Sequence, residues 1–139
     1  MKLTDLYEMA GETFLQLRHI FQSNFERRHL KLSLPTHSFE RSVEGERGDS
    51  ITKEQLSGAL QTFLKKYDSK NPEMMAVFEE ARERQQDVQV VFKHTSEGTT
   101  LNFPSVIKSL GPNSYRVTIK TIMVKNDFKP HKDDVVVNL

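Results

Sequence analysis

Cysteine is absent from the sequence, so neither a disulfide bond nor a thiolate metal site can contribute to the fold. Long apolar runs are absent as well, and none approaches the roughly 18 residues that a membrane-spanning helix needs. The chain starts MKLTDLYEMAGETFLQLRHIF, and acidic and polar residues interrupt the apolar core that a secretory signal would have. These absences lead us to expect a cytoplasmic protein with no membrane contact.

An excess of charge of one sign is also missing. The chain has 20 Lys and Arg residues against 19 Asp and Glu residues, which gives a net charge of +1. The chain as a whole is therefore not a polycation, and any binding to nucleic acid must come from local clusters of basic residues. A length of 139 residues is enough for one domain with its own core, so we expect residues 1–139 to form a single domain.

Several catalytic and metal-binding signatures are missing too. The sequence has no glycine-rich phosphate loop, no nucleophilic serine in a Gly-x-Ser-x-Gly turn and no pair of carboxylates at a typical spacing. The five histidines are not spaced as zinc ligands are. We therefore expect no metal and no cofactor, and we look for chemistry among the histidine and arginine side chains.

Apolar periodicity predicts helices in the N-terminal part of the chain and strands in the C-terminal part. Up to about residue 86, apolar side chains recur at steps of three and four, which is typical of amphipathic helices. From residue 88 onward they recur at every second position, which is typical of strands. The predicted helices cover residues 3–25, 36–44, 53–66 and 73–86. The predicted strands cover residues 88–93, 101–110 and 115–125, with short extended segments at 29–34 and 134–139.

We expect an α+β fold in which N-terminal helices pack on one face of a small antiparallel sheet. The sheet should have four strands, namely the three long strands and either 29–34 or 134–139. The helix at 53–66 should pack on it through four apolar residues, Leu56, Leu60, Phe63 and Leu64. Pro104 cannot donate a backbone hydrogen bond, so it should mark a bulge or a sheet edge.

Residues 35–56, PTHSFERSVEGERGDSITKEQL, hold the candidate catalytic site. If residues 36–44 are helical, His37 and Arg41 lie one turn apart on one face, and Arg47 follows in the next loop. Imidazole transfers protons near neutral pH, and guanidinium groups grip phosphate and stabilise the charge that develops on it. These three residues are our candidates for metal-independent cleavage of a phosphodiester. The alternative is that His37 is simply a residue at the N-terminus of a helix and that the two arginines are surface charges.

The segment HLKLSLPTHSFERSVEGERGDSITKEQL, residues 29–56, resembles the opening segment of the RelE-like and RegB-like endoribonucleases, which are small phage and toxin-type proteins. The residues that match their pattern are His37, Arg41, Arg47, Ile51 and Thr52. The later stretches VIKSL and YRVTIKTIMVKNDF are similar to sheet strands of these proteins. The resemblance implies a helix–sheet domain of phage or bacterial origin that cuts RNA, with the ribose 2′-hydroxyl as the internal nucleophile.

The predicted strand at 115–125 carries the candidate RNA-binding residues. Alternation places Arg116 and Lys120 on the same face of this strand, and Lys125 extends the basic character at its end. A basic and partly polar sheet face suits an RNA backbone. A sheet face that is simply solvated has the same composition, and this alternative stays open.

The function that we expect is that of a small RNA-binding, metal-independent endoribonuclease. In it, His37 is the general acid or base, and Arg41 and Arg47 hold the scissile phosphate. The alternative is a non-catalytic module that binds a host or phage protein through an amphipathic helix, or a minor virion component with the same fold. Convergence of the three residues in a basic site against the sheet would favour the ribonuclease.

Overall fold

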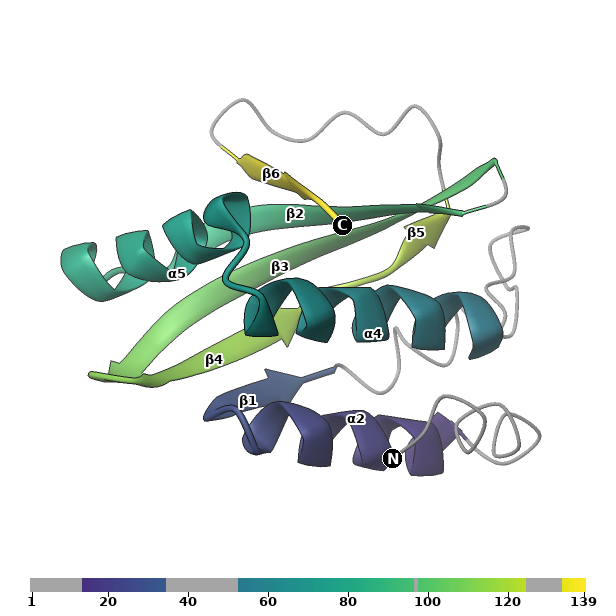
Figure 1. Cartoon of the computed structure of the whole chain (residues 1–139), viewed down its shortest axis with the longest axis horizontal. Coiled ribbons are helices and arrows are strands. Elements are labelled where there is room, and N and C mark those ends of the chain that lie inside the picture. Colours follow the sequence, from purple (N-terminus) through teal and green to yellow (C-terminus); the bar gives the residue numbers. More distant parts are fainter. Residues whose placement is uncertain (1–13, 35–52, 97, 125–133) are drawn as a thin grey trace.

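The fold has two layers, with helices packed on one face of a β-sheet (Figure 1). The computed structural model describes residues 14–34, 53–96, 98–124 and 134–139. The helices in these ranges are α2 (Phe14–Glu26), α4 (Lys53–Asp68) and α5 (Pro72–Arg84). The strands are β1 (Leu30–Ser33), β2 (Val88–Ser96), β3 (Thr99–Gly111), β4 (Ser114–Ile119), β5 (Met123–Val124) and β6 (Val135–Asn138). The α+β class expected from the sequence is confirmed.

The described helices follow the predicted periodicity closely. α4 and α5 match the predicted helices at 53–66 and 73–86 to within two residues at each end. The side chain of Asn71 caps α5 by accepting a hydrogen bond from the backbone N–H of Met74 at 3.2 Å. The predicted helix at 36–44 lies outside the described residues. Within the described ranges, no helix is long and apolar enough to cross a membrane.

The sheet is mixed, with the strand order β1–β4–β3–β2–β6 and with β5 paired to β3. Its centre is an antiparallel meander of β2, β3 and β4. The prediction of four antiparallel strands is wrong in two respects, because 29–34 and 134–139 both supply strands and each runs parallel to its neighbour. Neither outer strand is joined to its neighbour by a tight turn, and a longer connection permits the parallel pairing that a hairpin forbids.

The predicted strand at 115–125 is interrupted, which corrects a second expectation. β4 ends at Ile119, and the chain pairs again with β3 only at β5. The registers on either side show that three residues, 120–122, lie opposite two, 103–104. One extra residue on one strand is a β-bulge, and it changes which side chains face the core. β4 lies between β1 and β3, so it is an inner strand of the sheet.

Pro104 lies opposite this bulge and not at an edge of the sheet. Its carbonyl accepts a hydrogen bond from the backbone N–H of Lys120 at 2.8 Å, so its backbone polar groups face the bulged strand. On its other side, Pro104 and Val91 form a non-hydrogen-bonded pair of the antiparallel ladder, in which neither residue bonds to the other through its backbone. The missing N–H therefore falls where the ladder is already irregular, which explains how an inner strand tolerates a proline.

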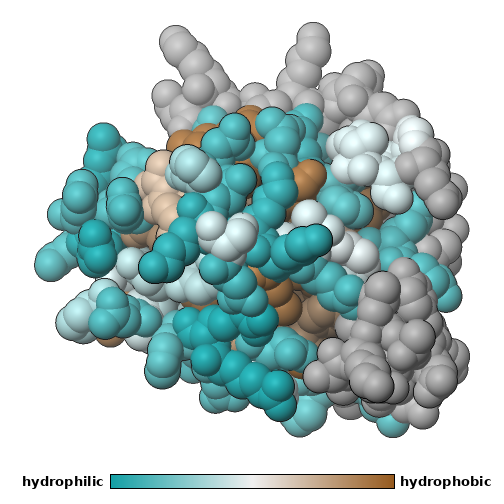
Figure 2. Space-filling view, in the orientation of Figure 1, coloured by the Kyte–Doolittle hydropathy of each residue, from teal (hydrophilic) through white to brown (hydrophobic). Residues whose placement is uncertain are grey.

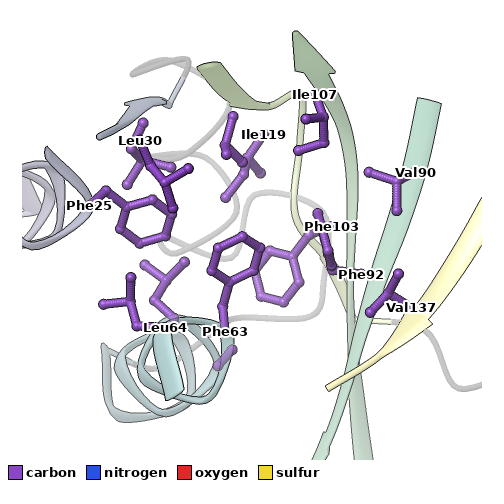
Figure 3. Close-up of a cluster of buried hydrophobic side chains, with 14 of the residues drawn as sticks. Phe25, Leu30, Phe63, Leu64, Val90, Phe92, Phe103, Ile107, Ile119 and Val137 are labelled. Atoms are coloured by element: carbon purple, nitrogen blue, oxygen red, sulfur yellow. The ribbon is translucent and has the colours of Figure 1, made fainter. Parts of the chain in front are cut away.

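Apolar side chains of the helices and strands meet in one core between the two layers (Figure 3). The four residues expected to pack α4 on the sheet are all buried, namely Leu56, Leu60, Phe63 and Leu64. Alternate residues of β4, namely Tyr115, Val117 and Ile119, are buried in the same core. Arg116 and Thr118 lie between them and point to the opposite face, where they are half-buried. One face of the sheet therefore supplies the core, and the other carries polar side chains together with the apolar Val91, Pro104 and Val106.

A charged pair joins the C-terminal ends of α2 and α4. The guanidinium of Arg28 donates two hydrogen bonds to the carboxylate of Asp68, from Nε to Oδ1 at 2.6 Å and from Nη2 to Oδ2 at 2.7 Å. It donates a third to the carbonyl of Asn24 at 2.7 Å. The hydrogen bonds from Arg28 hold the pKa of Asp68 below its ordinary value. The pair fixes the turn into β1 against the end of α4.

We expect Asp68→Asn to destabilise the protein at neutral pH only. The pKa of Asp68 is lowered on folding, so its stabilisation is present above the unfolded-state pKa of about 4 and is lost as the pH falls through the folded-state pKa. The side chain is 50% exposed, so the loss at pH 7 should be about 0.5 kcal/mol. Urea unfolding of the wild type and the variant at pH 7 and pH 3 measures this loss of unfolding free energy. Glu79→Gln, a substitution at an exposed position, is the control. A difference of equal size at both pH values would contradict this assignment.

Candidate nucleic-acid interface

A row of three cations crosses the polar face of the sheet. Lys31 in β1 lies directly opposite Arg116 in β4, and Arg116 lies directly opposite Lys108 in β3. Residues paired in this way share a face and lie on adjacent strands, about 4.8 Å apart. The basic row, as we call Lys31, Arg116 and Lys108, therefore spans about 10 Å across three strands.

The cations of the basic row have no ion-pair partner within the described residues. None of the row's three side chains forms an ion pair or a hydrogen bond with another described residue, and the ion-paired carboxylates Asp68 and Glu80 belong to α4 and α5. Lys31 and Lys108 are exposed, whereas Arg116 between them is half-buried. Like charges directly opposite one another on a sheet destabilise it, typically by a few tenths of a kcal/mol to about 1 kcal/mol per pair. The arrangement lowers the stability of the free protein, and an anion bound on the row would relieve the repulsion.

Lys120 adds a fourth cation to the same face. Its Nζ donates a hydrogen bond to Oε1 of Gln89 at 2.7 Å, and Gln89 is exposed beside the core residue Val90. Farther along this face, Val91 and Asn102 are buried, so the exposed basic area lies where β1, β4 and β3 run side by side. The surface is a positive strip and not a closed pocket.

The structure locates only part of the site expected from the sequence. Arg116 and Lys120 lie on one face, as the alternation predicts, although the bulge places Lys120 just beyond the end of β4. The candidate catalytic residues His37, Arg41 and Arg47 lie outside the described residues, and so does Lys125. Their roles stay predictions.

Two members of the basic row were not among the candidates from the sequence. The alternation of residues 29–34 does place Lys31 on the polar side of its segment, and Lys108 follows the core residue Ile107. Neither signal shows that the two lysines flank Arg116, because this depends on the parallel pairing of β1 with β4 for Lys31 and on the antiparallel register of β3 with β4 for Lys108. The pairing register is the information that sequence reasoning lacked.

His94 lies on the core face of β2, two residues after Phe92, and is remote from the basic row. Its Nε2 is 3.5 Å from Oγ1 of Thr62, whose hydroxyl donates to the carbonyl of Gly58 at 2.8 Å. Burial lowers the pKa of His94, which favours the neutral imidazole. Among the described side chains, no group of three His, Asp or Glu residues could hold a metal ion. We assign His94 a packing role.

Comparisons with models of protein families, with curated proteins and with solved structures find no match for this chain. The case for a function therefore depends on the charge and geometry of the sheet face and on the sequence patterns described above.

Reversing the central charge of the basic row should stabilise the free protein. Arg116→Glu converts two like-charge pairs, with Lys31 and with Lys108, into two opposite-charge pairs, so we expect a gain of about 1 kcal/mol at low salt. Thermal unfolding at low salt and at 1 M NaCl measures this gain in stability. Salt screens exposed charges, so most of the gain should disappear at 1 M NaCl. Arg116→Lys keeps the repulsion and is the control. A loss of stability that is equal at both salt concentrations would show that the charges of the row do not repel one another.

Proposed function

We propose that this protein binds RNA through the basic face of its sheet and acts as a small metal-independent endoribonuclease. The observation that carries the binding part is the basic row. Three unpaired cations occupy one line across three neighbouring strands, although any of the three positions could hold a neutral residue without loss of core packing. A phosphodiester backbone offers the repeated negative charge that such a line attracts, and Lys and Arg contacts to phosphate supply most of the affinity in non-specific binding.

The described surface favours a polyanion over an apolar protein partner. Leu110 is the only large apolar side chain that is exposed among the described residues. On the side seen in Figure 2, the described surface is mostly hydrophilic, and apolar atoms appear in small areas. Protein interfaces usually have an apolar centre with aromatic residues. This supports RNA binding over the alternatives of a protein-binding module or a virion component.

The cleavage part of the proposal comes from the sequence pattern of residues 37–47. In it, His37 removes the proton of the ribose 2′-hydroxyl or protonates the leaving 5′-oxygen. Arg41 and Arg47 hold the phosphate and stabilise its developing charge. The internal attack forms a 2′,3′-cyclic phosphate on one fragment and frees the 5′-hydroxyl of the other, so it needs no water molecule, metal or cofactor.

Binding by the basic row predicts a steep dependence on salt. Each phosphate contact with single-stranded RNA contributes about 0.7 to the slope of log affinity against log salt, so Arg116→Ala with Lys108→Ala should reduce the slope by about 1.4. Fluorescence anisotropy with a 2′-O-methylated oligonucleotide, which cannot be cleaved by the internal attack, measures binding alone. Arg27→Ala with Lys65→Ala removes two exposed cations outside the basic row, one in the turn after α2 and one in α4, and should leave most of the slope of log affinity against log salt unchanged. Absence of binding by the wild type at low salt would exclude the proposal.

Cleavage predicts a large effect at His37 with no effect on the fold. His37→Ala should slow cleavage of total cellular RNA by at least about 100-fold, since a positioned acid or base typically contributes about 10²–10⁴. Arg41→Ala should cost a similar factor by removing a donor to the phosphate. His19→Ala, at an exposed position of α2, is the matched control and should keep full activity.

The stability of these variants separates catalysis from a structural role. Substitutions of surface residues usually change stability by less than about 0.5 kcal/mol, so His37→Ala and Arg41→Ala should melt like the wild type. If the wild type binds RNA but leaves it intact, the binding part of the proposal stands and the catalytic part is excluded.

A further inference from the structure

A pocket of about 490 Å³ lies at the end of the basic row, between the C-terminal end of α5 and the hairpin of β3 and β4. All eight lining residues come from two short segments, residues 82–87 at the end of α5 and residues 108–112 at the hairpin. They are Arg82, Gln85, Gln86, Asp87, Lys108, Ser109, Gly111 and Pro112. Pockets of this size suit a small molecule or one nucleotide.

The pocket is continuous with the basic row because Lys108 belongs to both. Val88, the first residue of β2, pairs with Ile107 of β3. Asp87 precedes Val88 and Lys108 follows Ile107, so the antiparallel register places these two charged residues level with each other. A strand of RNA held on the row by its phosphates would thus have a pocket beside its last contact. The base of that nucleotide projects away from the sugar–phosphate backbone, so it is the part that would enter the pocket.

The charged side chains of the pocket are unengaged, whereas the Ser109 hydroxyl donates a hydrogen bond to the carbonyl of Gly111 at 3.3 Å. Together the lining residues offer both hydrogen-bond donors and acceptors. Arg82, Asp87 and Lys108 form no ion pair or hydrogen bond with any other described residue. Asp87 offers a carboxylate, and the last carbonyls of α5 add further acceptors and partial negative charge. Arg82 and Lys108 offer donors, and the amides of Gln85 and Gln86 offer both. This combination suits a planar ring with donors and acceptors on one edge.

We infer that this pocket receives one unstacked nucleobase that carries an exocyclic amino group, an inference that rests on the proposed binding of RNA by the basic row. The amino group of cytosine or adenine donates to the Asp87 carboxylate, and the neighbouring ring nitrogen accepts from an amide or a cation of the pocket. Uracil and hypoxanthine place a carbonyl oxygen where the amino group would be. That oxygen would face the carboxylate without a proton between them, so these bases are disfavoured.

Two matched pairs of oligonucleotides test the inference. Oligo(C) and oligo(U) differ at the C4 amino group, and oligo(A) and oligo(I) differ at the C6 amino group. With 2′-O-methylated octamers at fixed salt, the amino-bearing member of each pair should bind the full-length protein at least about tenfold more tightly. The salt slopes of the two members should be equal, because phosphate contacts set the slope.

Asp87→Asn should reduce both preferences to near unity, because an amide can present either a donor or an acceptor to the base. Glu83→Gln removes the same charge from an exposed position of α5 outside the pocket and should leave both preferences intact. Equal binding of the paired octamers, or a preference that survives Asp87→Asn, overturns the base pocket and leaves RNA binding by the row in place. Absence of any binding at low salt overturns the row as well as the pocket.

Discussion

The ring of Phe63 in α4 lies between the rings of Phe25 in α2 and Phe92 in β2, so this one cluster joins two helices to the sheet (Figure 3). The Phe63 ring stacks on Phe25 with centroids 5.2 Å apart, and it meets Phe92 edge-on at 5.0 Å. All three rings are buried, and aromatic pairs in these arrangements are worth about 0.5–1.5 kcal/mol beyond the area they bury. With α2 and α4 held on one side, the pleat of each strand sends every second residue to the other side. The polar face therefore follows from the position of the core.

The one-sided core explains how the protein tolerates the basic row. The stability of the fold comes from the buried face, so repulsion among Lys31, Arg116 and Lys108 on the opposite face subtracts only a small amount from it. β1 is an outer strand, and α2 keeps it in place through the Gln22 side chain, whose Nε2 donates to the carbonyl of Leu32 at 3.3 Å. A strand held in this way can keep an exposed lysine next to an arginine. An anion bound across the three strands would remove the repulsion, so binding and stability would be coupled.

Local sequence patterns were sufficient for the helices and for the faces of the strands, and insufficient for the pairing between distant segments. The periodicity of residues 53–66 identifies the buried face of α4 correctly, because each of its contacts requires an apolar residue at a fixed step. The pairing of β1 with β4 joins residues about eighty positions apart, and no local pattern encodes its direction or register. The bulge at 120–122 was not predicted, although strict alternation there places Thr121 on the apolar face and Ile122 on the basic face, and the bulge brings Ile122 into the core instead. The sequence thus identified Arg116 as a candidate, but its neighbours in the basic row depended on the sheet.

Affinity and selectivity have separate sources in the proposed interface. The cations of the row meet phosphates, which are the same in every nucleotide, so they fix the position of a strand without reading its sequence. Asp87 carries the opposite charge and would weaken the row if it lay among the three cations. It lies beyond Lys108 instead, in the pocket at the end of the row. A carboxylate there would contact a base and would not lie between the cations and the phosphates that they bind. The hairpin of β3 and β4 connects the two functions, because Lys108 on β3 lines the pocket and faces Arg116 on β4. In the proposed interface, the geometry of this one hairpin would therefore set both how strongly a strand is held and which base lies beside it.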